Sequence, residues 1–153
     1  MSKITKQTTV HATPEQVWAK LIEDPNHWGD WLTPVRKLVA PVHGTVAAGL
    51  EFPVLLGKLS GKIVVTEATT ARQLRWKAGP AMMLAMGMSM KGTLQLTPDG
   101  SGGSRVNLEM RSPMGPMGSM MMRMMAGLDS KEEMTRTIGR VKALAERAPG
   151  TTP

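Results

Sequence analysis

The 153-residue chain contains no cysteine, no tyrosine and a single phenylalanine. The absence of cysteine excludes disulfides, zinc ribbons and a thiol nucleophile. It is compatible with a reducing compartment, and we expect a cytoplasmic protein. Because four tryptophans and one phenylalanine are the only aromatic residues, other side chains must supply much of the bulk of the core.

The sequence also lacks long hydrophobic runs and dense runs of charge. Its most apolar stretch, residues 81–90, is too short to span a bilayer, and the first nine residues contain no apolar segment typical of secretory signals. The formal net charge is +7, but Lys and Arg are spread along the chain and no nucleic-acid-binding motif occurs. We therefore expect one soluble domain over residues 1–148, a disordered tail over residues 149–153, and no nucleic-acid partner.

Methionine is the residue present in excess. The chain has 15 methionines, and seven of them fall between residues 114 and 127. Methionine is unbranched and polarisable, so it fills irregular spaces and can repack around ligands of different shape. This cluster predicts either a pliable lining for an apolar ligand or a simple filling of the core.

The N-terminal part predicts a strand followed by a helix. Residues 3–11 alternate loosely and favour a strand. Thr13 is a good N-cap, Pro14 suits the first helical position, and Gln16 can complete a capping box. The helix should end before Pro25, since proline disfavours helical conformation in the residue that precedes it.

A short helix and a series of strands should follow. Trp28 and Trp31 lie three residues apart, which fits one helical turn with both rings on one side. From residue 35 to residue 110 the pattern is strand-like, with frequent glycine and proline turn signals. Short loops between neighbouring strands predict an antiparallel sheet. The candidate strands are residues 35–42, 50–59, 62–69, 73–78, 83–97 and 104–112.

The last third of the chain favours a long helix. Met134 and Val141 recur at helical spacing, as do the methionines upstream of them. A kink or restart is expected just after Gly127, where Ser130 and Glu133 could form a second capping box. The adjacent acidic pair that includes Glu133 should be solvated, because neighbouring helix positions do not face each other.

The order of these elements, together with several phrases, resembles the START-like superfamily, also called SRPBCC. Within it, the sequence is most similar to the polyketide cyclase/dehydrase and lipid-transport family. The phrases are ATPEQVWAKLIED, then DPNHWGDWLTPV, the strand QLRWKAG, the hairpin and strand DGSGGSRVNLEMR, and the closing ALAERA. Together they extend over residues 4–148.

This resemblance implies an α+β helix-grip fold, in which a curved antiparallel sheet of about seven strands surrounds a long C-terminal helix. Two short helices would follow the first strand. It also implies an apolar cavity between sheet and helix, since family members bind lipids, polyketides, hormones or aromatic compounds, and some catalyse cyclisation or dehydration. The lack of tyrosine departs from the family pattern and disfavours any mechanism that needs a tyrosine hydroxyl.

The expected ligand-binding residues are apolar. Trp28 and Trp31 would either flank the cavity entrance and stack on a flat ligand, or anchor the short helix on the sheet. Trp76 would face inward from its strand, with Arg75 and Lys77 facing outward. Within residues 83–97, alternation would place three methionines on one side of a strand. The predicted ligand-binding residues are Trp28, Trp31, Trp76, Met86, Met88, Met90, Met110, Met117, Met121 and Met124.

The remaining methionines of the cluster predict a surface role. Met120, Met122 and Met125 cannot all face the interior, so we expect an exposed apolar patch that contacts a membrane surface, a second copy of the chain or another partner. Thioethers suit copper(I), but the chain has no cysteine and its three histidines are far apart in sequence. We therefore predict no metal and no cofactor.

No catalytic motif occurs, and the catalytic residues, if any, are unknown. Three functions stay open: binding of a hydrophobic small molecule (a lipid, a quinone or a polyketide-like compound) in a Met-rich cavity, catalysis as a polyketide cyclase, aromatase or dehydratase, and interaction through the methionine patch. The candidate cavity acids, bases and polar groups, each expected to face outward more often than inward, are Glu51, Glu67, Glu109, Arg111, Asn107 and His43.

Overall fold

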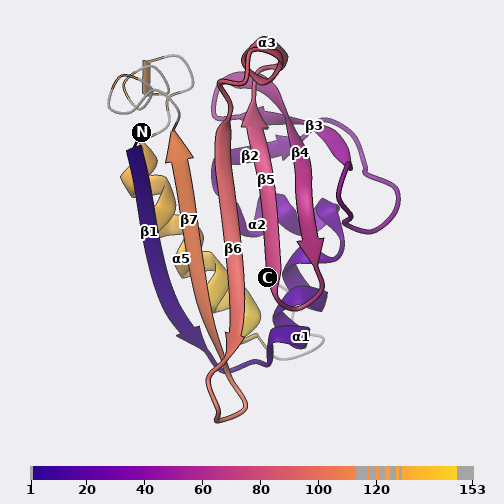
Figure 1. The fold of residues 1–153 in the computed structure, drawn as a ribbon, viewed down its shortest axis with the longest axis vertical. Helices are drawn as coiled ribbons and strands as arrows, with labels where there is room; N and C mark the ends of the chain where they lie inside the picture. Colours follow the sequence, from indigo (N-terminus) through magenta and orange to yellow (C-terminus); the bar gives the residue numbers. More distant parts are fainter. Residues whose placement is uncertain are drawn as a thin grey trace.

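The computed structural model describes residues 2–112, 117, 120, 123–124, 127 and 129–147. A seven-stranded antiparallel sheet curves around helix α5 (Ser130–Ala145), as Figure 1 shows. The strand order is β1-β7-β6-β5-β4-β3-β2, so the first strand closes against the last. The α+β helix-grip fold is therefore confirmed. The strands are β1 (Ser2–Val10), β2 (Val35–Leu38), β3 (Glu51–Leu56), β4 (Leu59–Thr69), β5 (Gln73–Gly79), β6 (Met90–Pro98) and β7 (Ser104–Ser112).

The two short helices after β1 are confirmed as well. The first begins with α1 (Pro14–Val17) and continues as the π-helical turn η1 (Trp18–Ile22). The predicted capping box is present, because the Thr13 hydroxyl accepts from the Gln16 N–H at 3.2 Å and the Gln16 side chain accepts from the Thr13 N–H at 2.8 Å. The second comprises the 3-10 turn η2 (Pro25–His27) and α2 (Trp28–Trp31).

The first helical segment holds the far end of α5. Lys20 donates from Nζ to the carbonyl oxygens of Ala145, at 3.2 Å, and Arg147, at 2.6 Å. The last carbonyls of a helix have no partner within the helix and carry partial negative charge, so a lysine there stabilises the helix end. This contact fixes the C-terminal end of α5 relative to the short helices.

The centre of the core is an aromatic cluster, and all five aromatic side chains of the protein are buried. The Trp28 ring centre lies 5.8 Å from that of Trp31, 5.5 Å from Phe52 and 6.0 Å from Trp76, in tilted or edge-to-face geometry. Such pairs stabilise a core beyond the area they bury. Indole N–H groups donate to backbone carbonyls, from Trp28 at 2.9 Å and from Trp31 at 2.8 Å. Of the two predictions for these tryptophans, the structure favours anchoring of α2 on the sheet.

The secondary structure predicted for residues 83–97 is wrong, and the strands predicted over residues 35–42 and 50–59 are shorter than expected. Residues 83–97 were expected to form one strand, but helix α3 (Ala81–Ala85) occupies the beginning of this stretch and β6 starts only at Met90. Alanine, methionine and leucine are strong helix formers, which favours helix where no strand partner is available. Gly87, with φ +73°, ends the turn in a conformation that suits glycine. The three methionines therefore do not share one face of a strand.

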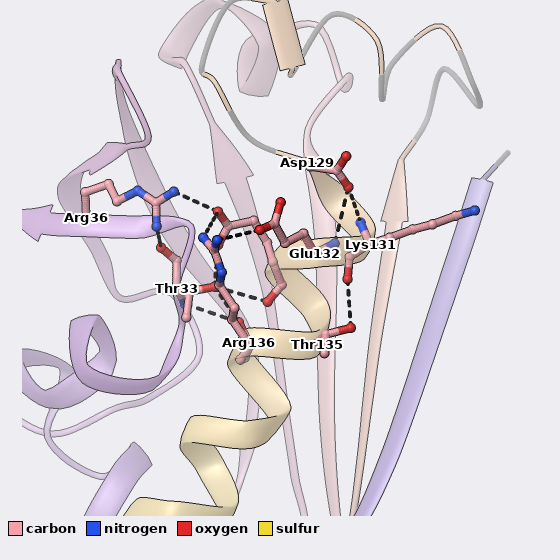
Figure 2. Close-up of polar contacts among 9 residues, drawn as sticks. Thr33, Arg36, Asp129, Lys131, Glu132, Thr135 and Arg136 are labelled. Carbon is pink, nitrogen blue, oxygen red and sulfur yellow. Dashed lines mark hydrogen bonds and ion pairs between the residues drawn. The ribbon is translucent and has the colours of Figure 1, made fainter.

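The restart of the C-terminal helix lies where it was predicted, but its cap differs. Gly127 has a φ of +72°, and Asp129, not Ser130, is the N-cap: its carboxylate accepts from the N–H groups of Lys131 and Glu132 at 3.1 and 3.2 Å (Figure 2). These bonds, the Glu132 N–H first among them, lower the pKa of Asp129. The proposed Ser130–Glu133 box is wrong, because the Glu133 side chain turns into the protein.

Candidate functional site

The inner face of the sheet, toward α5, is almost free of ionisable groups. At the inward positions of β3 to β7 the side chains are apolar or small, whereas β1 places Lys6 there, opposite Leu108. On β5 the inward residues are Leu74, Trp76 and Ala78, which confirms the predicted alternation with Arg75 and Lys77 outside. This inner face can therefore offer mainly apolar contact to a bound molecule.

On β1, β6 and β7 the large apolar side chains of the inner face become less buried toward one end of the sheet. We call this end, where β5 runs into α3, β6 and β1 begin and β7 finishes, the α3 end of the sheet (Figure 1). In the middle of the sheet Leu94 and Leu108 are fully buried. Closer to the α3 end, Ile4 and Met110 pair across β1 and β7 and are only half-buried, as is Met90 at the start of β6.

A buried hydroxyl lies at the same end. Ser112 is 4% exposed, and among the residues that the structure describes its Oγ has no hydrogen-bond partner. Lys91 pairs with Arg111, so in an antiparallel sheet Ser112 lies opposite Met90, and alternation turns both inward. A buried hydroxyl without a partner destabilises the folded state, and a ligand that pairs with it removes that cost.

The structure divides the predicted ligand-binding residues into three groups. The tryptophans, Trp28, Trp31 and Trp76, are in the packed core. Met90 and Met110 face inward at the α3 end, and Met88 is half-buried in the segment that leads into β6.

The other predicted methionines do not lie with Met90 and Met110 at the α3 end of the inner face. Met86, Met117 and Met124 are 60%, 66% and 78% exposed, respectively. Met121 lies outside the described residues, as do Met122 and Met125 of the predicted patch, while Met120 is 61% exposed. Of the predicted set, the structure therefore brings together Met90 and Met110, near the buried indole of Trp76.

The structure contains a buried polar cluster that the sequence did not predict. We call it the Glu133 cluster, and Figure 2 labels its members Thr33, Arg36 and Arg136. Glu133 is 5% exposed, and its carboxylate accepts from Arg36 Nη2 at 2.7 Å and from the hydroxyl of Thr33. Thr137 lies 3.0 Å from the same hydroxyl, and Arg136 adds a second cation at 3.7 Å. The cluster joins the first turns of α5 to the segment between α2 and β2.

The expectation that the acidic pair is solvated is thus correct for Glu132 and wrong for Glu133. The Glu132 side chain is 58% exposed, but Glu133 lies on the helix face toward Thr33, which is 100 residues away in sequence. No local pattern reveals such a partner. Arg36 and Arg136 lie at one carboxylate oxygen of Glu133 and the Thr33 hydroxyl donates to the other. This geometry suits holding the helix in place better than transferring protons.

The other candidate acids lie outside the core. Glu51 and Glu67 have half or nearly half of their side-chain surface exposed, and each pairs with a surface cation. Glu109, on the outer face of β7, lies 2.9 Å from Arg111 and 3.5 Å from Lys3. Partial burial acts to raise the pKa of Glu109, but these two cations outweigh it and lower the pKa overall.

The described residues offer little else for catalysis or metal binding. His43 is exposed in the segment between β2 and β3. Within the described ranges, no three His, Asp or Glu side chains gather as a metal site would require. One hollow of about 640 Å³ lies on the polar outer face of the sheet. Another, of about 680 Å³, lies at the end of the sheet that contains the β4–β5 turn.

The fold and the apolar inner face define a class of protein: a START-like, helix-grip domain. The family model described as "Polyketide cyclase / dehydrase and lipid transport" matches residues 1–146. The chain belongs to this family. No curated protein sequence matches it.

Solved structures with the same fold are distant in sequence. The Aha1 dimer from Colwellia psychrerythraea superposes with a TM-score of 0.67 at 15% identity, over 98% of this chain and 100% of that one. Protein CV1439 from Chromobacterium violaceum gives 0.65 at 16% identity, over 96% and 99%. DynU16, a protein of the dynemicin biosynthetic locus, gives 0.60 at 18% identity, over 96% of this chain and half of its own. At these identities the likeness establishes the fold alone.

Among the described residues, none of the helices has the length and apolar character needed to cross a bilayer.

Proposed function

We propose that the protein binds a hydrophobic small molecule, of lipid, quinone or polyketide-like character, at the α3 end of the inner face. The ligand lies against Ile4, Met90 and Met110, and a polar group on it pairs with the Ser112 hydroxyl. Membership of a family named for polyketide cyclisation and lipid transport supports this class of ligand.

The observation that carries the proposal is the buried Ser112 hydroxyl, which lies among half-buried apolar side chains and has no hydrogen-bond partner within the described ranges. Transfer of apolar ligand surface out of water would drive binding, at about 25 cal/mol per Å² before the entropic costs of association. Met90 and Met110 can adopt several rotamers and so adjust to the ligand's shape. A single hydroxyl would orient the ligand without making the site selective for charge.

Catalysis is the weaker alternative. General acid–base chemistry needs an ionisable group within hydrogen-bonding reach of the substrate. The inward positions of β3 to β7 provide none, and Glu133 is already occupied by Arg36 and Thr33. A cyclase or dehydratase activity would need Lys6 or a residue outside the described ranges.

Two variants test the site with a dansyl-labelled fatty acid as the fluorescent probe. The double variant Met90→Gln, Met110→Gln keeps side-chain length but removes apolar contact, and should weaken binding about tenfold or more. The exposed pair Met82→Gln, Met86→Gln is the matched control and should bind the probe as the wild type does. Equal affinity of all three proteins would contradict the site.

The Ser112→Ala variant provides an independent readout. It removes a buried hydroxyl that has no hydrogen-bond partner among the described residues, so the free energy of unfolding should stay the same or rise. Loss of one hydrogen bond to the ligand should weaken binding about fivefold. A variant that is less stable but binds the probe normally would show that the hydroxyl serves the fold instead.

A further inference from the structure

Four cations form a row across the outer face of the sheet, near the α3 end. The strand register places Lys77 opposite Lys91, Lys91 opposite Arg111, and Arg111 opposite Lys3. All four residues are exposed. Since neighbouring strands are about 4.8 Å apart, this basic row is about 15 Å long. It borders the outer hollow of about 640 Å³, which Lys77, Lys91 and Arg111 help to line.

The basic row is unfavourable for the isolated fold. Like charges directly opposite each other on a sheet destabilise it. Glu109 offsets part of this repulsion by pairing with Arg111 and Lys3. In the described part of the chain, no carboxylate forms an ion pair with Lys77 or Lys91. The row therefore keeps an excess of positive charge that an anionic partner can neutralise.

Two exposed methionines, Met82 and Met86, lie in the connection between the strands that carry Lys77 and Lys91. Helix α3 connects the strand that carries Lys77 to the strand that carries Lys91, and Figure 1 shows it at the end of these strands. Met82 and Met86 are 73% and 60% exposed. Their spacing of four residues places them on the same side of the helical turn. The end of the sheet thus combines exposed apolar side chains with a row of cations.

We propose that the basic row and the α3 methionines dock on a membrane of anionic phospholipid. The lysines and Arg111 contact the phosphate groups, and Met82 and Met86 enter the boundary between headgroups and acyl chains. Peripheral membrane contacts use this pairing of apolar and basic side chains. This membrane contact does not depend on the ligand proposed above. It would, however, place the α3 end, where that ligand is proposed to bind, at the membrane surface.

Other anionic partners fit these observations less well. Proteins that bind single-stranded nucleic acid stack bases on aromatic side chains, but every aromatic side chain of this protein is buried. An acidic protein would engage the basic row, yet it would leave the exposed pair Met82 and Met86 without a role. The membrane accounts for both the cations and the methionines.

The test is co-sedimentation with vesicles of phosphatidylcholine alone and of phosphatidylcholine mixed with phosphatidylglycerol. The wild type should bind only the mixed vesicles, and added salt should weaken this binding. The double variant Lys77→Gln, Lys91→Gln should lower the partition coefficient about thirtyfold, since each lysine near an anionic surface contributes about a fivefold factor. The pair Met82→Gln, Met86→Gln should also weaken binding, but leave its dependence on salt unchanged.

The matched control is Arg72→Gln, Arg105→Gln, which removes the same charge from exposed positions at the opposite end of the sheet. It should bind nearly as the wild type does. Equal losses in both charge variants would reduce the effect to net charge and overturn the proposal. The proposal would also be overturned if the wild type did not bind the mixed vesicles but bound poly-glutamate through Lys77 and Lys91. That result would assign the basic row to an acidic protein partner. Because the lysine variant relieves repulsion, its melting temperature should not fall, so lost binding cannot be ascribed to unfolding.

Discussion

Replacing Gly92 with alanine is expected to destabilise the protein by about 3 kcal/mol, at the upper end of the usual cost of overpacking a core. Gly92 lies opposite Trp76 in the register of β5 and β6. A Cβ at Gly92 would come within 2.8 Å of Trp76 Nε1 and closer still to two ring carbons. The ring cannot move aside, since it is 1% exposed and packs 6.0 and 6.1 Å from Trp28 and Trp31. Urea denaturation measures the effect.

A double-mutant cycle separates this clash from a general intolerance of alanine in the strand. In the background of Trp76→Leu the large ring is gone, so adding Gly92→Ala should cost less than about 1 kcal/mol further. The same substitution at exposed Gly139 on α5, where a Cβ would meet no atom within 4 Å, should not destabilise the protein. A cost at Gly92 that is independent of residue 76 would contradict the packing described here.

Replacing Glu133 with alanine should destabilise the protein by about 2–3 kcal/mol. The substitution leaves Arg36 and the Thr33 hydroxyl without the buried carboxylate that accepts from them, but the Arg36 side chain is 39% exposed and water can take up part of the loss. The neighbouring substitution Glu132→Ala is the control and should change the free energy of unfolding by no more than about 0.5 kcal/mol.

The intermediate variant Glu133→Gln tests which part of the Glu133 cluster matters. Glutamine can still accept from the Thr33 hydroxyl but forms no ion pair with Arg36, so its cost should fall between those of the two alanine variants. If Glu133→Ala and Glu132→Ala were equally stable in urea, the cluster would not hold α5 against the segment between α2 and β2.

The sequence predicted those elements whose determinants are local. The capping box at Thr13 and Gln16, the alternation around Trp76 and the restart after Gly127 each depend on residues close together in the chain. Helix α3 was missed because its methionines fit a strand pattern as well as a helix pattern, and only the absence of strand pairing before Met90 decides between them. Periodicity alone often fails for such short apolar runs.

The candidate site was harder to predict, because its determinants come from distant parts of the chain. Met90 and Met110 were predicted, but nothing near Ser112 in the sequence shows that its hydroxyl is buried and lacks a hydrogen-bond partner in the described part of the chain. The tryptophans were predicted to contact ligand or to anchor α2, and only their mutual packing favours the second role. The basic row was not predicted either, because its four residues are far apart in the sequence. Only the register of the sheet brings them side by side.

The central claim is that a hydrophobic ligand binds against the inner face at the α3 end, and methyl NMR of methionine tests it most directly. With the methionine methyl groups labelled and single substitutions used for assignment, titration with the dansyl-labelled fatty acid should shift the resonances of Met90 and Met110. The resonance of Met134, which is 4% exposed in the core, should stay in place or move much less. A titration that shifts only exposed methionines such as Met82, or none at all, would contradict the account.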